Sequence, residues 1–201
     1  MINYNKKQQQ STVTKNSIIN NAMSLFVERG YFNVTLRDIA KRAGLSTGAL
    51  YTHFKTKEDI AKELFQTTSN FIKEKLEFSI KNANTTKDKI KGIIDTIFIL
   101  AETNRGMMEY AFYTKHRDIF SDGKSICSSA PLDLLKQFLK FEVKNKRLRV
   151  IDINLGVISL TGIAIRLIIS SWDGVIKGDV ANYKDEVFEI VWGILKPEGS
   201  D

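Results

Sequence analysis

Residues 35–57 read TLRDIAKRAGLSTGALYTHFKTK, and their first half predicts a short helix with a clear start and a clear end. Thr35 is suited to cap the helix, and Asp38 supplies the acidic side chain that a capping box places in the first turn. The apolar residues of Leu36–Ala43 recur at helical spacing, so one face is expected in a core. Gly44 follows where helices often end in the left-handed backbone region.

The second half of the stretch predicts another short helix. Ser46 can cap a helix Thr47–His53, whose Leu50 faces inward together with the following Phe54. Two short helices joined by a tight turn that contains glycine form a helix-turn-helix unit. In such units the second helix can enter the major groove of DNA.

The outward face of the second helix is suited to approach a nucleic acid closely. Thr47, Gly48 and Ala49 are small, and the free N–H groups of the first helical turn favour an anion. Thr56 can cap a third helix, and Lys57 then stands at its N-terminus, where its ammonium group can meet a phosphate.

The motifs in residues 18–64 resemble the DNA-binding domain of the TetR family of bacterial transcriptional regulators. The family's aromatic and glycine pattern appears as Phe26, Gly30 and Tyr31, and its Gly-x-Leu-Tyr-x-His-Phe-x-x-Lys pattern runs from Gly48 to Lys57. The resemblance implies an all-α protein that forms homodimers. It also implies a divergent C-terminal domain that binds a small-molecule effector and thereby releases DNA.

The same resemblance assigns the residues that contact DNA. Thr47 and Thr52 stand where the family often has longer or aromatic side chains, so base specificity stays open. The expected contacts to double-stranded DNA are Thr35, Arg37, Ser46, Thr47, Gly48, Tyr51, Thr52, His53 and Lys57.

The positive charge lies in the N-terminal part of the chain. The 201 residues have a formal net charge of +7, and residues 1–57 contain nine Lys and Arg against two acidic residues, so they account for all of it. A basic module beside a neutral body is typical of nucleic-acid binders. The single Cys127 excludes an intramolecular disulfide and a cysteine zinc cluster, which favours a reducing, cytoplasmic location.

The predicted architecture is all-α with about nine helices. Residues 1–14 are expected to form a disordered polar arm, residues 15–62 the helix-turn-helix domain, and residues 63–201 a helical domain for ligand binding and dimerisation. After the long helix that begins at Lys57 and runs to about residue 80, helices are expected at 87–103, 107–120, 131–146, 152–175 and 180–195, with a loop at 121–131.

The last two predicted helices carry more apolar residues than a single buried face needs. They are either buried within a monomer or paired with their copies in a four-helix homodimer interface, as the resemblance implies. We favour the dimer, which implies a palindromic operator. The apolar stretch 155–169 contains Arg166 and is shorter than the ~20 residues of a membrane span, so no membrane partner is expected.

The effector site is the least determined part of the sequence. Aromatic and sulfur-containing side chains with a few polar groups are typical of small-molecule pockets, although for each residue alone core packing is the more common role. Arg166 lies in an apolar run, where a buried guanidinium needs an acidic partner or an anionic ligand. The candidate ligand-binding residues are Arg105, Met108, Tyr110, Phe112, Tyr113, His116, Phe138, Arg166 and Trp172.

Catalysis is not expected. The chain has two histidines, no glycine-rich phosphate loop and no legible pair of nucleophile and base, and His116 has no second His or Cys at metal-ligand spacing. No catalytic residue, metal or cofactor is therefore assigned. The sequence predicts a repressor that a largely apolar ligand releases from DNA. The alternatives are a helical adaptor that binds a protein partner and a DNA-binding regulator that responds to no ligand.

Overall fold

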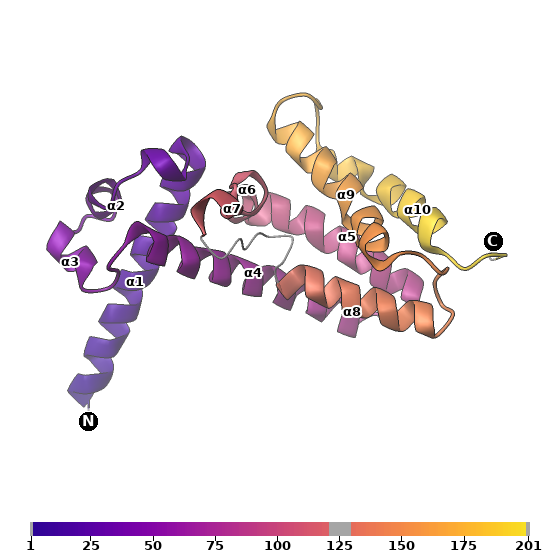
Figure 1. The fold of residues 1–201 in the computed structure, drawn as a ribbon, viewed down its shortest axis with the longest axis horizontal. Coiled ribbons are helices and arrows are strands. Elements are labelled where there is room, and N and C mark those ends of the chain that lie inside the picture. Colours follow the sequence, from indigo (N-terminus) through magenta and orange to yellow (C-terminus); the bar gives the residue numbers. More distant parts are fainter. Residues whose placement is uncertain (1, 121–129, 200–201) are drawn as a thin grey trace. The chain divides into compact units, whose positions relative to one another are not determined.

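The computed structural model describes residues 2–120 and 130–199, and its regular elements are helices (Figure 1). None of the described residues lies in a strand, and the all-α prediction is confirmed. The elements are α1 (Ile2–Arg29), η1 (Tyr31–Asn33), α2 (Leu36–Arg42), α3 (Thr47–Tyr51), α4 (Lys57–Lys81), α5 (Thr86–Thr103), α6 (Arg105–Tyr113), α7 (His116–Ile119), α8 (Ala130–Lys144), α9 (Ile153–Trp172), η3 (Val180–Tyr183) and α10 (Lys184–Leu195). Cys127 and most of the predicted loop lie outside the described residues.

The chain divides into two compact units. The first contains the residues up to Thr68 together with the returning segment from Gly106 to the end of α7, and the second contains Ser69–Arg105 and the described residues from Ala130 onward. Helix α4 passes from one unit to the other as a continuous helix of 25 residues. The sequence predicted a first domain of contiguous residues, whereas the first unit is built from two separate segments.

The returning segment joins the first unit because its side chains complete that unit's core. Tyr110 of α6 and Phe120, which follows α7, are buried with residues of α1, α2, α3 and α4. The Tyr110 hydroxyl donates a hydrogen bond to the backbone oxygen of Ala61 at 3.2 Å, and this bond is buried. Such contacts link residues about fifty positions apart, so local sequence patterns do not reveal them.

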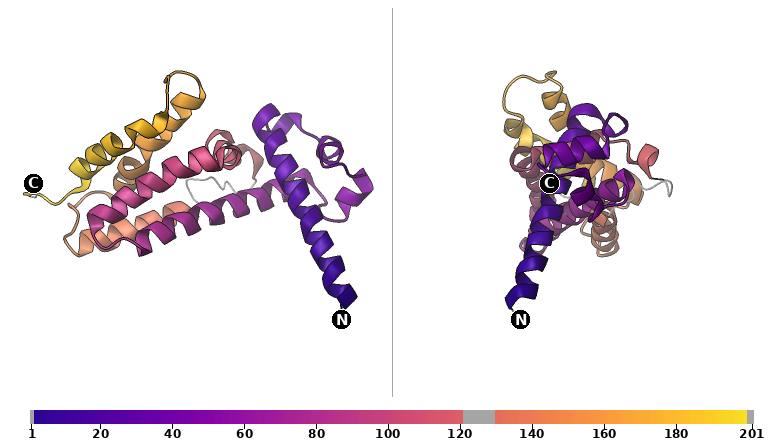
Figure 2. Two further views of the ribbon diagram at one scale, coloured as in Figure 1. Left: turned by 180° about the vertical axis from the view of Figure 1, so that it is seen from behind. Right: turned by 90° about the vertical axis from the view of Figure 1, so that its left-hand side faces the viewer.

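Helix α1 is longer than the sequence predicted. It begins at Ile2, so residues 2–14 of the arm that was expected to be disordered are helical. Residues 2–29 contain neither glycine nor proline, which permits the extension. Residues 8–13 of this helix are exposed, and Ile18 is the first residue from position 8 onward that is buried (Figure 2).

The second unit packs α5 against α9 and α10, and α8 against α9. Its core includes a row of isoleucines along α5 at helical spacing, which are Ile90, Ile93, Ile94 and Ile97. Helices α8 and α9 approach closely at Gly156, where an added Cβ would lie 3.1 Å from a methyl group of Leu139. A larger residue at this position would require the Leu139 side chain to shift.

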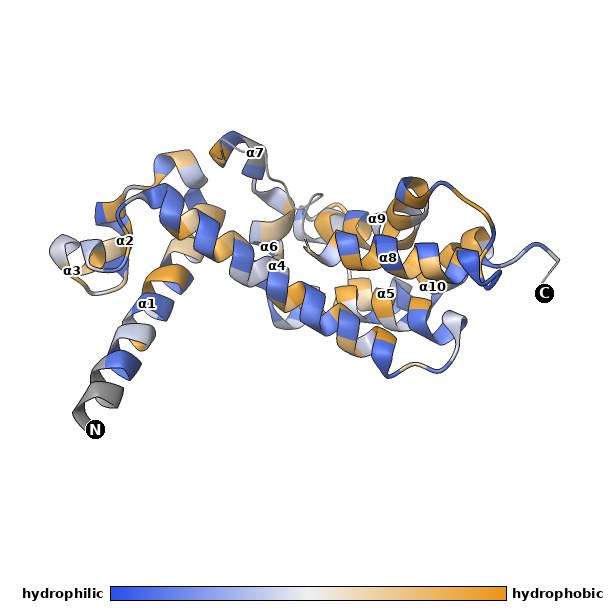
Figure 3. Ribbon diagram, turned by 60° about the horizontal axis from the view of Figure 1, so that its bottom comes forward, coloured by the Kyte–Doolittle hydropathy of each residue, from blue (hydrophilic) through white to orange (hydrophobic). Residues whose placement is uncertain are grey.

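Helix α9 is strongly hydrophobic and only partly covered (Figure 3). Its exposed apolar side chains include Leu155 and Ile158, which are 54% and 63% exposed. Among the described helices it meets the length and composition of a membrane span, with 20 residues and a mean hydropathy of 1.8, although the apolar stretch 155–169 was judged too short for one. The same length and composition occur in helices of soluble proteins, so this criterion alone is weak evidence.

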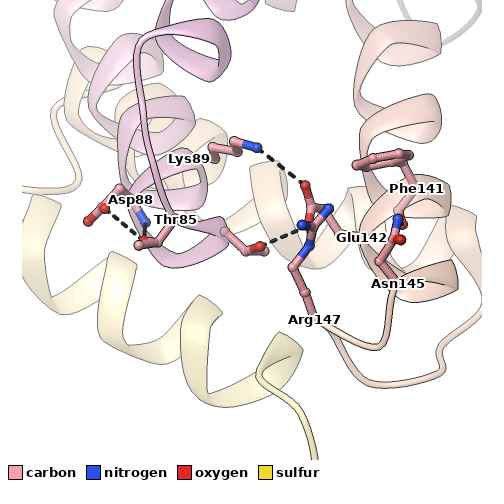
Figure 4. Close-up of polar contacts among 8 residues, drawn as sticks. Thr85, Asp88, Lys89, Phe141, Glu142, Asn145 and Arg147 are labelled. Carbon is pink, nitrogen blue, oxygen red and sulfur yellow. Dashed lines mark hydrogen bonds and ion pairs between the residues drawn. The ribbon is translucent and has the colours of Figure 1, made fainter.

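A buried carboxylate connects α8 to α5 in the second unit (Figure 4). Glu142 is 1% exposed and accepts hydrogen bonds from the Thr86 hydroxyl at 2.8 Å and from Nε of Arg147 at 2.6 Å. The ammonium of Lys89 lies 3.5 Å from the other carboxylate oxygen. A charge in this position is tolerated because two cations pair with it and one of its oxygens accepts two hydrogen bonds.

Candidate nucleic-acid interface

The helix-turn-helix begins with the predicted capping box. The Thr35 hydroxyl accepts the backbone N–H of Asp38 at 3.1 Å, and the Asp38 carboxylate accepts the backbone N–H of Thr35 at 2.9 Å. These hydrogen bonds lower the pKa of Asp38 below its ordinary value. Ile39 and Ala40 of α2 are buried, so the helix is fixed by both its cap and its core face.

The turn and the second helix occur where the sequence predicted them, but the second helix ends earlier than predicted. Gly44 has φ of 68°, which is the left-handed conformation that the sequence predicted there. The Ser46 hydroxyl accepts the backbone N–H of Ala49 at 3.1 Å and caps α3. Helix α3 ends at Tyr51 rather than at His53, because the Thr52 side chain bonds back to the Ala49 oxygen at 2.7 Å and the chain turns.

The outer surface of this unit leaves most of the predicted DNA contacts accessible. Leu50 is buried beneath α3, while the other face of the helix is solvent-exposed. The exposed candidates are Thr35, Arg37, Ser46, Thr47, Gly48, Tyr51 and Thr52, whereas His53 and Lys57 are half-buried.

Lys57 has a structural role in addition to the predicted phosphate contact. Its ammonium donates hydrogen bonds to the backbone oxygens of Tyr31 at 2.8 Å and Val34 at 2.7 Å. It also lies 4.2 Å from the centre of the Tyr31 ring, and burial lowers its pKa. Since an ammonium has three donors, one donor remains for a phosphate.

The cationic face of α2 is partly neutralised. Arg42 forms an ion pair with Glu28 of α1 at 2.7 Å, whereas Arg37 and Lys41 are exposed. Arg42 therefore ties α2 to α1 through a contact between residues fourteen positions apart, which local sequence patterns do not reveal.

Five of the predicted ligand-binding residues lie in the first unit. Met108, Tyr110 and His116 are buried, Phe112 is half-buried and Tyr113 is exposed. The ring centres of Tyr110 and His116 are 5.0 Å apart. Three of these residues are therefore buried, and the other two, Phe112 and Tyr113, are partly or fully accessible to solvent.

His116 is a polar group enclosed by aromatic rings. Its ring is 5.0 Å from that of Phe65 and packs on Phe120, and it is 3% exposed. Burial lowers its pKa to about 4. Its Nε2 atom has no hydrogen-bond partner in the described structure, so this nitrogen is a candidate contact for a polar group of an effector.

The other four predicted ligand-binding residues lie in the second unit. Arg105 stacks on the Trp172 ring at 5.5 Å, and both line a cleft of about 320 Å³ with Glu102 and Asp179. Phe138 is buried in α8. Arg166 is exposed on α9, so the prediction that it is buried is wrong for the single chain.

Sequence reasoning did not anticipate a second cleft, which lies in the first unit. A cleft of about 390 Å³ lies between the end of α1, η1 and the segment α6–α7, and Tyr31, Phe32 and Tyr113 contribute aromatic walls. Phe32 is one of the most exposed large apolar side chains described. The two adjacent aromatic residues Tyr31 and Phe32 are the feature of the sequence that could have indicated this cleft. No group of His, Cys, Asp or Glu in the described ranges is arranged to hold a metal ion.

Comparisons with known proteins agree with this geometry. The family model of bacterial regulatory proteins of the tetR family matches residues 18–64. A fatty acid metabolism regulator protein of Bacillus subtilis is 37% identical over 83 residues, which cover 41% of this chain and only 43% of that relative. A negative transcriptional regulator of a biofilm operon, from Staphylococcus aureus, is 27% identical over 187 residues, which cover 90% of this chain and 99% of the relative.

A solved structure extends the likeness to both units. The structure of a transcriptional regulator from Bacillus subtilis in complex with stearoyl-CoA matches with a TM-score of 0.75 and 23% identity, and the match covers 87% of this chain and 96% of that one. Residues 18–64 therefore match the tetR family of bacterial regulatory proteins, and the solved structures show that the whole chain shares their fold.

Proposed function

We propose that this protein is a transcriptional regulator that reads DNA through α3. The observation that carries the proposal is that α3 is capped by Ser46 and held by buried Leu50, while its small residues Thr47 and Gly48 remain exposed. A rigid helix with an accessible N-terminal half is what major-groove recognition requires. The positive charge of residues 1–57 favours the same partner.

We infer that the working form is a homodimer built on α9 and α10. These helices pack on each other and leave apolar side chains uncovered, including Leu155, Ile158 and Ile190. An apolar patch of this kind needs a cover, and a copy of the same helix pair supplies one with matching shape. Two reading units related by a two-fold axis would bind an inverted-repeat operator with half-sites ~34 Å apart.

We further infer a repressor that a small, largely apolar ligand releases from DNA. The relatives named as a fatty acid metabolism regulator and as a negative regulator, and the solved relative with stearoyl-CoA, support an acyl-CoA or a related acyl compound. Within the second unit, the cleft that Arg105 and Trp172 line is the candidate site for such a ligand. Catalytic activity forms no part of the proposal.

The proposed mechanism uses two states of the protein. Because α4 is one helix that belongs to both units, a shift of its C-terminal half would be transmitted along the helix. The coupling between ligand and DNA equals the difference in ligand affinity between the two states, and it is typically ~1–3 kcal/mol. A ligand that binds without changing DNA affinity would contradict this mechanism.

The test is a binding titration with DNA from the region upstream of the protein's own gene, in excess unrelated competitor at physiological salt. A discrete complex at nanomolar protein supports the proposal, since non-specific binding is ~10⁻⁴–10⁻⁶ M. Thr47→Ala and Tyr51→Phe should weaken that complex without lowering the thermal midpoint. Binding that does not distinguish the upstream DNA from competitor would favour the adaptor.

Palmitoyl-CoA and stearoyl-CoA are the probes for release, with free coenzyme A as the control. Release by the acyl forms and not by coenzyme A would support an apolar effector. A complex that resists all three would overturn the acyl-ligand part of the proposal and leave the DNA-binding part standing.

A further inference from the structure

The N-terminal half of α1 extends beyond the core of the first unit (Figure 2). Sixteen helical residues precede Ile18, which corresponds to about 24 Å of helix, and Ile18 is the first buried residue from position 8 onward. Residues 8–13 are all exposed. We refer to residues 2–14 as the N-terminal arm.

The composition of the arm excludes an apolar docking surface. Its described exposed residues are polar except for Val13, and a helix that is polar nearly all round gains nothing from burial in a hydrophobic groove. The chain has no acidic residue before Glu28, whereas Lys6, Lys7 and Lys15 are all basic. The kind of partner that complements a cationic, amide-rich helix without carboxylates is a polyanion.

The base of the arm is fixed next to the helix-turn-helix. The Lys15 ammonium pairs with Glu63 of α4 at 2.7 Å and lies 5.6 Å from the centre of the Phe54 ring. Lys15 also lines a cleft of about 340 Å³ with His53 and Lys55, which follow α3. The arm therefore starts beside the predicted phosphate contact His53 and belongs to the same compact unit as α3.

We propose that the N-terminal arm is a second DNA-contacting element, which binds the phosphates flanking the half-site that α3 reads. This inference rests on the proposed DNA-binding function and extends it beyond the helix-turn-helix. Phosphate contacts of this kind position a protein and raise its affinity but carry no base information. The arm thus enlarges the footprint of each subunit without changing its sequence preference.

The salt dependence of DNA affinity measures how many phosphates the arm neutralises. Each phosphate that a lysine neutralises contributes about −0.9 to the slope of log K against log salt. Loss of Lys6 and Lys7 should therefore reduce the slope by about 1.8 for each bound subunit. Between 50 and 200 mM salt, the wild-type affinity should fall about 12-fold more per subunit than that of the variant.

The experiment compares Lys6→Gln/Lys7→Gln with the control Lys140→Gln/Lys177→Gln. Both pairs remove two positive charges, and the control lysines are exposed in the second unit. Glutamine preserves helix propensity, and circular dichroism verifies the helix content of each variant. Affinity is measured by fluorescence anisotropy from 50 to 200 mM salt on the upstream operator, in a form with 10 flanking base pairs on each side and in a form without them.

The expected result is a smaller slope for the arm variant on the flanked operator, no difference from the control on the trimmed operator, and unchanged sequence preference on both. Equal slopes for the arm variant and the control on flanked DNA would overturn the proposal. A random duplex of the flanked length separates this outcome from failure of the proposed function. If the wild-type protein shows no sequence preference, the proposed function fails, while the two slopes on random DNA still decide whether the arm binds phosphates.

Discussion

Replacing Glu142 should show how much the buried carboxylate contributes to the stability of the second unit. Glu142→Gln keeps the volume and one acceptor but removes the charge that faces Arg147 at 2.6 Å and Lys89 at 3.5 Å. Hydrogen bonds to charged groups contribute about 1.5–3 kcal/mol and neutral ones about 0.5–1.5 kcal/mol. Lys89 and Arg147 are not fully enclosed and can turn toward water, so we expect a loss of about 1–2 kcal/mol.

Glu142→Ala should cost more, about 3–5 kcal/mol, since it leaves a cavity and removes the partner of the buried Thr86 hydroxyl. The assay is urea unfolding followed by circular dichroism, with fixed protein concentration because a dimer makes the midpoint concentration-dependent. Glu74→Gln, an exposed carboxylate on α4, is the matched control and should change stability by less than about 0.5 kcal/mol.

A double-mutant cycle tests the assigned contact directly. Thr86→Val and Glu142→Gln should be non-additive by at least about 0.5 kcal/mol, because the two side chains share one hydrogen bond. Additive effects, or a Gln variant as stable as the wild type, would refute the reasoning that this carboxylate stabilises the packing of α5 on α8.

Three further variants test the first unit. Burial lowers the pKa of His116 to about 4, so below about pH 6.5 the unfolded chain binds a proton that the folded chain does not bind. As the pH falls to 4, the free energy of unfolding of the wild type should therefore decrease by about 3 kcal/mol relative to that of His116→Phe, measured by unfolding titrations. Parallel pH profiles for the two proteins would contradict this. Tyr110→Phe should cost about 1 kcal/mol through loss of its bond to Ala61, measured by urea unfolding, and a neutral result would mean that this bond adds nothing. Ser46→Ala should cost about 1 kcal/mol by removing the cap on Ala49, read as a lower thermal midpoint, with Ser46→Asp expected to restore it.

The helix-turn-helix could be predicted from sequence because its determinants are local. The Thr35 capping box, the left-handed Gly44 and the Ser46 cap each act within three residues, and all three occur in the structure as the pattern indicated. The end of α3 was misplaced because the bond from the Thr52 side chain to a backbone oxygen competes with continued helix.

The composition of the first unit could not be predicted, because it depends on contacts between distant segments. The apolar pattern of residues 107–120 indicated a helix but not its partner, and the chain in fact turns after Tyr113 and resumes as α7 at His116. The N-terminal arm was read as disordered because polar composition suggests no core, although nothing in it breaks a helix. Arg166 was expected to be buried because its neighbours are apolar, yet that face of α9 is uncovered.

The discontinuity of the first unit has a consequence for protein engineering. A fragment that ends at Thr68 would retain the helix-turn-helix but lack Tyr110, Ile119 and Phe120, and the apolar surfaces they cover would face water. Transplanting the helix-turn-helix unit onto a protein of the same fold therefore requires two exchanged segments, with the second inserted between α5 and α8. Chimeras joined only within α4 would place α6 and α7 of the other protein against the core of this first unit. The solubility of such chimeras would show how well the foreign α6 and α7 cover that core.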